Sequence, residues 1–398
     1  MNVLKNRQFI LSILLAMFTV FNGAKWLYTF SNAPYQALDF RTYYTGAKTY
    51  FSDLNPYYKN DQTITWLKMA NHETSPNFDA HETVVYAPQF VWFFWPYQLL
   101  DFHQAKWLQF ALNILSLLIC AWLIHRLRPQ LSPKLILLSI GAFKGTWFAL
   151  SNGQPMIQIL TLIVLSFHLL YIKKWQWLPG FILGLCGFKF TLLIPVGLFL
   201  LMGKQFKTFF IMAAVMLLLN ALAINACIVP DLMLKSWQHN LSYLFNYNHV
   251  FQTLNGINII NTSSSVVLKY FIDLPNTAIH FMYTLMLLLG SLSVTWMHRH
   301  STGFRPLFVL SLLTFCFGQH LMYDILVLVV YFLLQKEERE EPKVAIVLLL
   351  VLILPLSILA KAIPLIHFIL PLTLLVYTLE VLGIDYRWMR NKATKNAN

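Results

Sequence analysis

The sequence predicts an all-α protein that crosses a membrane many times. Hydrophobic residues make up 58% of its 398 residues, charged residues make up only 11%, and the mean hydropathy is +0.58. A soluble domain carries roughly 25% charged residues, so most of this chain must be solvated by lipid or by other helices. The formal charge of +13 comes from short basic groups between apolar runs. That distribution is typical of cytoplasmic loops and differs from the single patch that would bind nucleic acid.

The first apolar run predicts a membrane helix over residues 8–30. Lys5 and Arg7 precede it, and this beginning resembles a signal peptide. The run is long enough to cross a bilayer and many apolar segments follow, so we expect an uncleaved helix that enters from the cytoplasm. Residues 31–82 then form a polar loop with six of the sixteen acidic residues. An acidic loop in a basic protein is expected on the outer side, with short surface helices.

The next segments predict a surface piece and three crossings. Residues 84–100 are aromatic and contain two prolines, which favours a re-entrant or surface-lying segment over a short span. Residues 104–125 are expected to cross to a basic cytoplasmic loop. Segments 134–150 and 156–172 are expected to form a hairpin whose tip, 151–155, faces outward.

The run 177–202 predicts two half-length helices. Basic residues bound it at both ends, and Lys189 interrupts it. Because both ends are then cytoplasmic, we expect the first half-helix to dip toward the outer leaflet and the second to return, with Lys189 at the turn.

The remaining segments continue the alternation of apolar crossings with outer and cytoplasmic loops. We expect a second outer loop, rich in asparagine, over 230–275, and a basic cytoplasmic tail over 383–398. The scheme gives ten to twelve crossings, both termini in the cytoplasm, and one membrane domain over 1–382. The later crossings are expected at 206–229 and 276–297 and in the hairpins 304–334 and 343–382.

Four polar residues reach the outer side in this scheme: Asp39, Gln154, Lys189 and His320. Ionisable residues inside membrane spans are expensive and are functional candidates by default. Several of them on one face indicate a site more strongly than any one alone.

Asp39 is the leading candidate for chemistry. It is the first carboxylate of the chain, and Tyr43 and Tyr44 follow it closely. A carboxylate at the membrane surface can remove a proton from a hydroxyl as that hydroxyl attacks an electrophilic carbon. The alternative role is the N-cap of a surface helix, a position that favours Asp.

Each of the other candidates also has two interpretations. Lys189 either binds a lipid phosphate or extends its amine to the interface. Gln154 is either part of a helix-entry turn or a polar contact in the outer cavity. His320 and Asp324 are four residues apart and share a helix face, so they either contact substrate or pair internally. A metal site would need more ligands than these segments supply.

The sequence predicts neither a nucleotide site nor a cysteine site. It contains no P-loop and no Rossmann fingerprint, so a phosphorylated lipid suits it better than a nucleotide donor, and no cofactor is expected. The cysteines lack zinc or redox spacing and are expected to be apolar core residues: Cys120, Cys186, Cys227 and Cys316.

Several short motifs follow one another along the chain: Asp39-Phe-Arg-Thr-Tyr-Tyr44 with Asn55-Pro-Tyr57, Tyr86-Ala-Pro88, Gly153-Gln154, Gly184-Leu-Cys-Gly-Phe-Lys189, Asn261-Thr-Ser-Ser-Ser-Val266 and Tyr323-Asp324. In these motifs and their order, the chain resembles membrane glycosyltransferases of the GT-C type. It is most similar to glycosyltransferase family 87, which includes polyprenol-phosphate-mannose-dependent mannosyltransferases. The first block is the most specific. Gln89 and Pro155 depart from the family pattern.

The resemblance implies a GT-C fold with Asp39 as the general base on the first outer loop. It implies an inverting transfer of a sugar, by default mannose, from a polyprenyl-phosphate donor to a hydroxyl of an envelope glycolipid or glycan. Such an enzyme lies in the plasma membrane with its site on the outer face. The residues expected to bind donor or substrate are Arg41, Tyr43, Tyr44, Tyr86, Gln154, Lys189, His320, Tyr323 and Asp324.

Two other functions compete with this interpretation. A transporter or flippase of lipid-linked sugars would also use broken helices and ionisable residues at the midplane. The sequence, however, shows no pair of matching halves. A scaffold subunit of an envelope assembly would not need Asp39.

Overall fold

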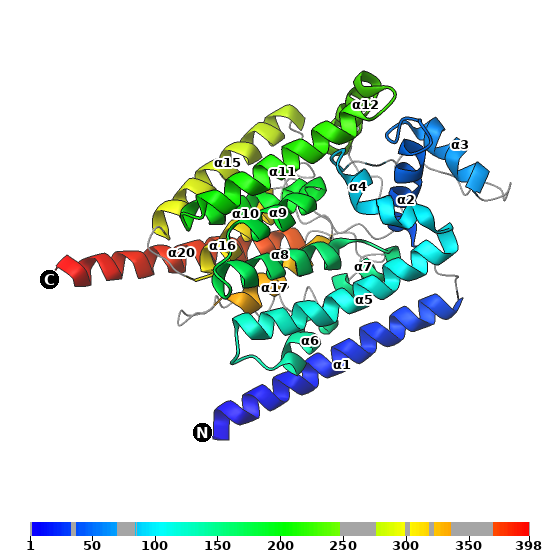
Figure 1. Cartoon of the computed structure of the whole chain (residues 1–398). Helices are drawn as coiled ribbons and strands as arrows, with labels where there is room; N and C mark the ends of the chain where they lie inside the picture. Colours follow the sequence, from blue (N-terminus) through cyan, green and yellow to red (C-terminus); the bar gives the residue numbers. More distant parts are fainter. Residues whose placement is uncertain are drawn as a thin grey trace.

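The computed structural model describes residues 2–32, 37–69, 84, 86–246, 276–298, 303–317, 322–335 and 369–397. Their regular structure is helical, and no strand occurs among them, so the predicted all-α membrane class is confirmed (Figure 1). The helices are α1 (Asn2–Asn32), α2 (Leu38–Tyr50), α3 (Lys59–Met69), α4 (Phe90–Phe94), η1 (Trp95–Leu99), α5 (Phe102–Leu127), α6 (Pro133–Ala142), α7 (Lys144–Asn152), α8 (Met156–Tyr171), α9 (Trp177–Leu185), η2 (Cys186–Lys189), α10 (Phe190–Met202), α11 (Phe206–Asn225), α12 (Pro230–Asn246), α15 (Asn276–Met297), α16 (Arg305–Phe317), η4 (Met322–Ile325), α17 (Leu326–Leu334) and α20 (Ile369–Ala397).

The long helices lie roughly side by side, with the two chain ends at one end of the bundle and α2, α3 and α4 at the other (Figure 1). By length and composition, α5, α11 and the run 177–202 (α9, η2 and α10) are candidate membrane spans, and α6 with α7 forms a bent one. The number of crossings stays a prediction, because residues 247–275 and 336–368 lie outside the described part of the chain.

The run 177–202 turns back on itself. As one straight helix its 26 residues would measure about 39 Å. The Thr208 hydroxyl nevertheless donates a hydrogen bond to the Gln176 carbonyl over 2.9 Å, so the two ends of the run are close. Thr208 follows Met202 by only six residues, which bridge at most about 22 Å. The chain therefore reverses at η2, and the predicted pair of half-helices is confirmed.

Glycines allow α9 to pack closely against α11. A Cβ atom added at Gly180 would lie 2.6 Å from the Thr208 carbonyl oxygen, and one at Gly184 would lie 2.5 Å from the Val215 Cβ. The contacts advance in the same direction along both helices, so α9 and α11 are parallel. The return of α10 brings Gly197 back toward Phe209, near the beginning of α11. Lys189, the last residue of η2, thus lies at the tip of this pair.

The pair α6–α7 corrects the predicted hairpin, because its first limb bends by 73° at Phe143. A break inside a membrane exposes carbonyl groups that need donors. Side chains supply them: the Thr146 hydroxyl donates to the Ile140 carbonyl, the Trp147 indole to Gly141 and the Asn22 amide to Ala142. The predicted turn between the two limbs is confirmed, since α7 ends at Asn152 and α8 begins at Met156.

The segment 84–100 contains the short helices α4 and η1, which lie beside α2 (Figure 1). Five residues each are too few to cross a bilayer, so the short-span alternative is excluded. Trp95 and Leu99 are exposed, as expected for a surface-lying piece.

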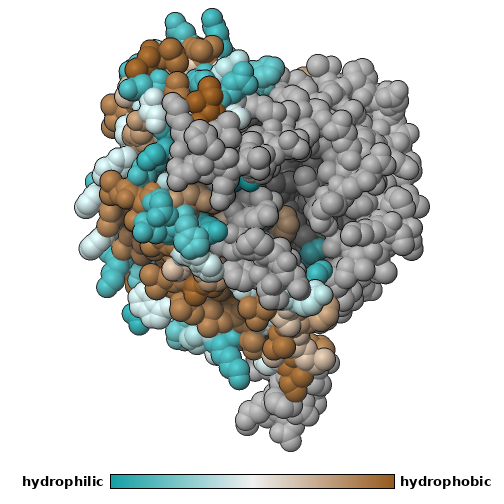
Figure 2. All heavy atoms as spheres, turned by 90° about the vertical axis from the view of Figure 1, so that its right-hand side faces the viewer, coloured by the Kyte–Doolittle hydropathy of each residue, from teal (hydrophilic) through white to brown (hydrophobic). Residues whose placement is uncertain are grey.

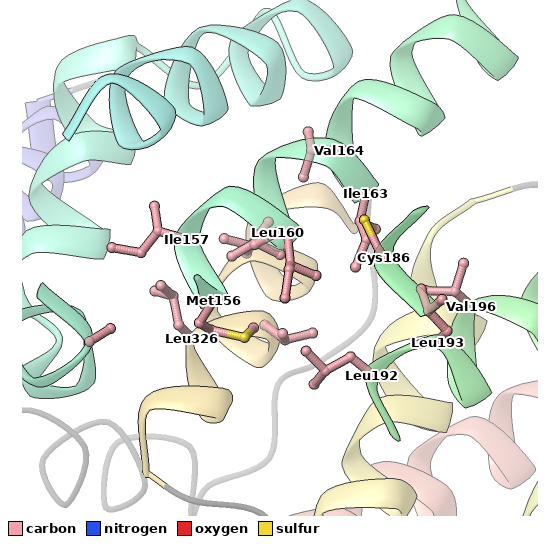
Figure 3. Close-up of a cluster of buried hydrophobic side chains, with 14 of the residues drawn as sticks. Met156, Ile157, Leu160, Ile163, Val164, Cys186, Leu192, Leu193, Val196 and Leu326 are labelled. Carbon is pink, nitrogen blue, oxygen red and sulfur yellow. The ribbon is translucent and has the colours of Figure 1, made fainter. Parts of the chain in front are cut away.

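The apolar core lies around α8, which is buried on nearly all sides. Figure 3 shows Met156 and Leu160 of α8 facing Leu192 of α10 and Leu326 of α17. All four cysteines are reduced and buried, which confirms the interpretation of them as core residues. Because α8 begins at Met156, this core fixes the position of the turn that precedes it.

Candidate active site

Asp39 lies in the first turn of α2, at the end of the bundle away from the chain termini (Figure 1). Figure 2 views the molecule from this end, where hydrophilic residues of the described chain lie beside hydrophobic ones. The N-cap of α2 is Ala37, in a left-handed conformation with φ 46° and no side-chain cap. The alternative role of Asp39 as N-cap is therefore excluded. Its Oδ2 instead accepts a hydrogen bond from Gln154 Nε2 over 2.6 Å.

The surroundings of Asp39 raise the pKa of its carboxyl from 3.8 to about 6. Burial is the main cause, because it disfavours the charged form. The hydrogen bond from Gln154 and the positive charge of Lys189 act in the opposite direction and limit the rise of the pKa. A carboxyl group with this pKa is ionised at neutral pH and is a better proton acceptor than an ordinary aspartate.

Gln154 is held in a tight turn between α7 and α8. Gly153 adopts φ 65°, which glycine tolerates without strain, and it is the C-cap of α7, while Pro155 is the N-cap of α8. From α5, the Gln109 amide donates to the Gly153 carbonyl and the Asn113 amide to the Gln154 carbonyl, each over 3.0 Å. These two supports were not predicted from the sequence. Their signal is a pair of polar residues four apart in an apolar helix, which share one face.

Two tyrosines close a hydrogen-bonded ring with Gln154. Gln154 Nε2 donates to the Tyr43 hydroxyl over 2.9 Å, Tyr43 donates to the Tyr86 hydroxyl over 3.1 Å, and Tyr86 donates to Gln154 Oε1 over 3.3 Å. The two phenol rings stack with centroids 4.9 Å apart. The hydrogen-bonded ring directs the nitrogen of the Gln154 amide toward Asp39. This orientation suits a carboxylate, because a carboxylate accepts hydrogen bonds.

Lys189 and Asp324 form a buried ion pair next to this ring. Lys189 Nζ lies 2.5 Å from Asp324 Oδ1, and both residues are only 5% exposed. The amine also lies 5.6 Å from the centroid of the Tyr86 ring and 3.8 Å from Met156 Sδ. Tyr86 therefore contacts both Gln154, which holds Asp39, and Lys189.

The segment that carries Tyr86 is fastened to the tip of the re-entrant pair. The Ala87 amide donates to the Phe188 carbonyl over 3.2 Å, and Gln89 Nε2 donates to the Gly184 carbonyl over 3.0 Å. Asn220 of α11 exchanges hydrogen bonds with Gln89. Gln89, a departure from the family pattern, is thus a structural anchor of the site.

The Asn-Pro-Tyr motif holds Tyr86 from its other side. The Tyr57 hydroxyl donates to the Tyr86 carbonyl over 2.7 Å. Asn240 of α12 donates to the carbonyl groups of Tyr57 and Val84, each over 3.1 Å. Asn240 belongs to the asparagine-rich stretch, yet it is buried and supports the backbone.

Some of the expected binding residues lie apart from this cluster. The Tyr44 hydroxyl donates to the Leu100 carbonyl over 2.7 Å, and its ring packs against Phe102. Arg41 is buried on α2, two residues beyond Asp39 and therefore on another face of the helix. Tyr323 lies in η4, where its side chain is not described, and His320 lies outside the described residues. Among the described residues, no three His, Cys, Asp or Glu side chains form a group that could hold a metal ion.

One comparison identifies relatives of the chain. The family model of glycosyltransferase family 87 matches residues 85–355. The matched range contains Tyr86, Gln154, Lys189 and Asp324 and begins after Asp39. No curated protein and no solved structure gives a significant match.

Proposed function

The chain belongs to glycosyltransferase family 87, and on that premise we propose that it moves a sugar from a polyprenyl-phosphate donor to a hydroxyl of an envelope glycolipid or glycan. Mannose is the sugar that the resemblance favours. The family makes the protein a membrane glycosyltransferase, and the donor, the acceptor and the residue roles below are proposed.

The observation that supports this reaction is that Asp39 and Lys189 lie near each other and are both linked to Tyr86. Asp39 reaches the Tyr86 hydroxyl through Gln154, and Lys189 faces the Tyr86 ring. An inverting transfer needs a base for the incoming hydroxyl and a positive charge near the leaving group. Asp39 can supply the base, and Lys189 can supply the positive charge.

In the proposed step, the acceptor oxygen attacks the anomeric carbon of the sugar. The bond from that carbon to the phosphate oxygen breaks, and its electron pair leaves with the phosphate. Asp39 takes the proton of the acceptor hydroxyl, and Lys189 stabilises the charge that develops on the phosphate. Phosphate is a good leaving group, so the site needs no second carboxylate to protonate it, unlike glycoside hydrolysis.

The arrangement of the chain supports a site on the outer face of the plasma membrane. Both termini lie at one end of the bundle, and α2, which carries Asp39, lies at the other (Figure 1). Basic residues near both termini support a cytoplasmic position for that end: Lys5, Arg7, Arg387 and Arg390. A lipid-linked donor would then reach Lys189 from within the membrane.

The proposal is tested with purified protein, radiolabelled polyprenyl-phosphate-mannose and a lipid extract of the host. Label should enter a new product with the wild type and not with the Asp39→Asn variant. Transfer by neither protein would mean either that the sugar is not mannose or that the protein is a transporter, and a panel of other lipid-linked sugars would separate the two. Full transfer by the variant would reject Asp39 as the base.

A lipid-linked-sugar transporter is the second candidate, because α9 and α10 are half-helices with a buried ion pair at their tip. The two functions differ in one product. A transferase releases polyprenyl phosphate only when an acceptor is present, whereas a transporter moves the intact donor and releases none.

A further inference from the structure

Lys189 is already neutralised in the structure. Its amine lies 2.5 Å from the Asp324 carboxylate, and water reaches little of either residue. Two charges buried at this distance interact strongly, so a phosphate that approaches Lys189 also meets the negative charge of Asp324. The pair must therefore rearrange for Lys189 to serve a departing phosphate.

The charge of the phosphate changes during the proposed reaction. In the donor, the phosphate is a diester with one negative charge. When the bond to the sugar breaks, the phosphate keeps the electron pair and becomes a monoester, whose charge approaches −2 above its second pKa of about 6. A lysine without a competing carboxylate would hold this product more tightly than the donor, and slow release would limit turnover.

We infer that Asp324 is a positioning residue for product release. Its ion pair with Lys189 breaks when the donor phosphate binds Lys189, and the pair forms again as polyprenyl phosphate leaves. The inference rests on the proposed donor class. No atom is transferred to Asp324, because the acceptor proton goes to Asp39 and the electron pair stays on the phosphate. Asp324 acts only by competing for the amine.

The two partners of this pair are held in different ways. Lys189 is fixed, because η2 is bonded through the Phe188 carbonyl to Ala87 and α9 packs tightly on α11 through Gly184. Asp324 belongs to a separate element, the four-residue η4. An exchange of partners therefore needs movement of η4 or of the carboxylate alone, and the cation keeps its place next to Tyr86.

Direct binding of polyprenyl phosphate to the full-length protein in detergent tests the inference. The Asp324→Asn variant should bind the monoester at pH 7.5 about tenfold more tightly than the wild type, because it removes a negative charge that competes for Lys189. The methyl diester of polyprenyl phosphate carries one charge and should gain only about threefold, because the electrostatic energy scales with ligand charge. Under transfer conditions, kcat of the variant should fall while the donor KM does not rise.

Asp385→Asn is the matched control. Asp385 is also fully buried and pairs with Arg305 over 3.3 Å, away from the site. The Asp385→Asn variant should have a lower thermal stability than the wild type and no gain in phosphate affinity. Asp324→Glu keeps the charge and should restore wild-type affinity. If Asp324→Asn does not fold, Asp324→Ser replaces it, since serine can still accept a hydrogen bond from Lys189.

The outcomes separate the inference from the proposed function. Equal or weaker monoester binding by the Asp324 variants, with clear binding by the wild type, would overturn the release role and leave the donor class standing. An equal gain for monoester and diester would also overturn it, because the effect would not follow charge. Binding of neither lipid by any protein would overturn the donor class and the inference together.

Discussion

Gln154 donates its side-chain amide to Asp39 over 2.6 Å, although 115 positions separate the two residues in the chain. The bond joins the turn between α7 and α8 to the first turn of α2. It also connects two parts of the chain that the family comparison treats differently, because the match begins at residue 85. Asp39 lies before that boundary, and its hydrogen bond to Gln154 places it next to the polar residues of the matched region.

Replacing Asp39 by Asn should abolish most of the sugar transfer. The amide cannot take a proton from the acceptor, so the rate should fall roughly 100- to 10,000-fold, the usual contribution of a general base. The fold should persist, because the Asn carbonyl can still accept the bond from Gln154. The measurement is label transfer from a lipid-linked donor at saturating concentration.

Asp53→Asn is the control for this experiment. Asp53 is exposed in the same loop and has φ 60°, a conformation that Asn adopts readily. The Asp53→Asn substitution removes one carboxylate and should leave transfer at the wild-type rate. An equal loss in both variants would mean that the loop needs its total charge and not a base at position 39.

The pH dependence of transfer should report the raised pKa of Asp39. Burial raises this pKa to about 6, and the base works only when it is ionised. The rate at low donor concentration should therefore rise with pH through about 6 and level off above 7. An acidic limb near 4 would show instead that Asp39 titrates like an exposed carboxyl group.

The same pKa predicts that Asp39→Asn stabilises the protein at neutral pH. The folded-state pKa lies above the unfolded value, so the folded state holds its proton more tightly, and this stability is lost as pH rises through about 6. Above that pH, the buried carboxylate lowers the free energy of unfolding, and the neutral Asn removes this cost. The variant should melt at a higher temperature than the wild type at pH 7.5 and show no such gain at pH 4. A lower melting temperature at pH 7.5 would contradict this view.

The sequence alone predicted part of this arrangement. The alternation of basic loops and apolar runs places Asp39, Gln154, Lys189 and His320 on one side of the membrane. The structure brings Asp39, Gln154 and Lys189 near one another, and His320 lies outside the described residues. Charge asymmetry acts on whole segments and is readable without contacts. The return of the chain at Lys189 was predictable for the same reason, because basic residues bound both ends of 177–202.

Contacts between distant segments could not be predicted in this way. The break between α6 and α7 depends on Asn22, which lies 120 positions from the carbonyl that it satisfies. The supports of the Gly153–Gln154 turn come from Gln109 and Asn113 of another helix. A single sequence shows that such residues are polar but not which backbone groups they reach. The residues that support the Gly153–Gln154 turn were therefore not predicted.

Removing only the hydroxyl of Tyr86 should weaken catalysis. Phe at this position keeps the stacking on Tyr43 and the face toward Lys189, but it opens the ring that orients the Gln154 amide. Loss of one or two such hydrogen bonds should lower kcat roughly five- to tenfold and leave the donor KM nearly unchanged.

Tyr50→Phe is the matched variant for Tyr86→Phe. Tyr50 is also buried, and its hydroxyl donates to the Ala223 carbonyl over 2.9 Å, outside the ring. It should cost stability without changing kcat. Wild-type kcat in Tyr86→Phe, with a normal melting temperature, would remove the ring from the mechanism.

The close packing of α9 on α11 should make Gly184 intolerant of any side chain. A Cβ atom there would lie 2.5 Å from the Val215 Cβ and 3.0 Å from the Met212 carbonyl oxygen, so one helix must move. Overpacking of this kind costs about 1–3 kcal/mol. The Gly184 carbonyl also accepts the bond from Gln89, so movement of α9 should shift Lys189 away from Tyr86. Gly184→Ala should therefore lower both the melting temperature in detergent and the rate of transfer.

Gly383→Ala tests whether the clash causes these losses. Gly383 also lies inside a helix, but the nearest atom to an added Cβ is 3.9 Å away, so Ala fits without strain. Helix propensity predicts a small gain in stability there, because Ala favours the helix over Gly by up to about 1 kcal/mol. A loss in Gly184→Ala together with a gain in Gly383→Ala assigns the effect to the α9–α11 contact. If Gly184→Ala kept both wild-type stability and wild-type transfer, close approach of these helices would not be what holds Lys189 in the site.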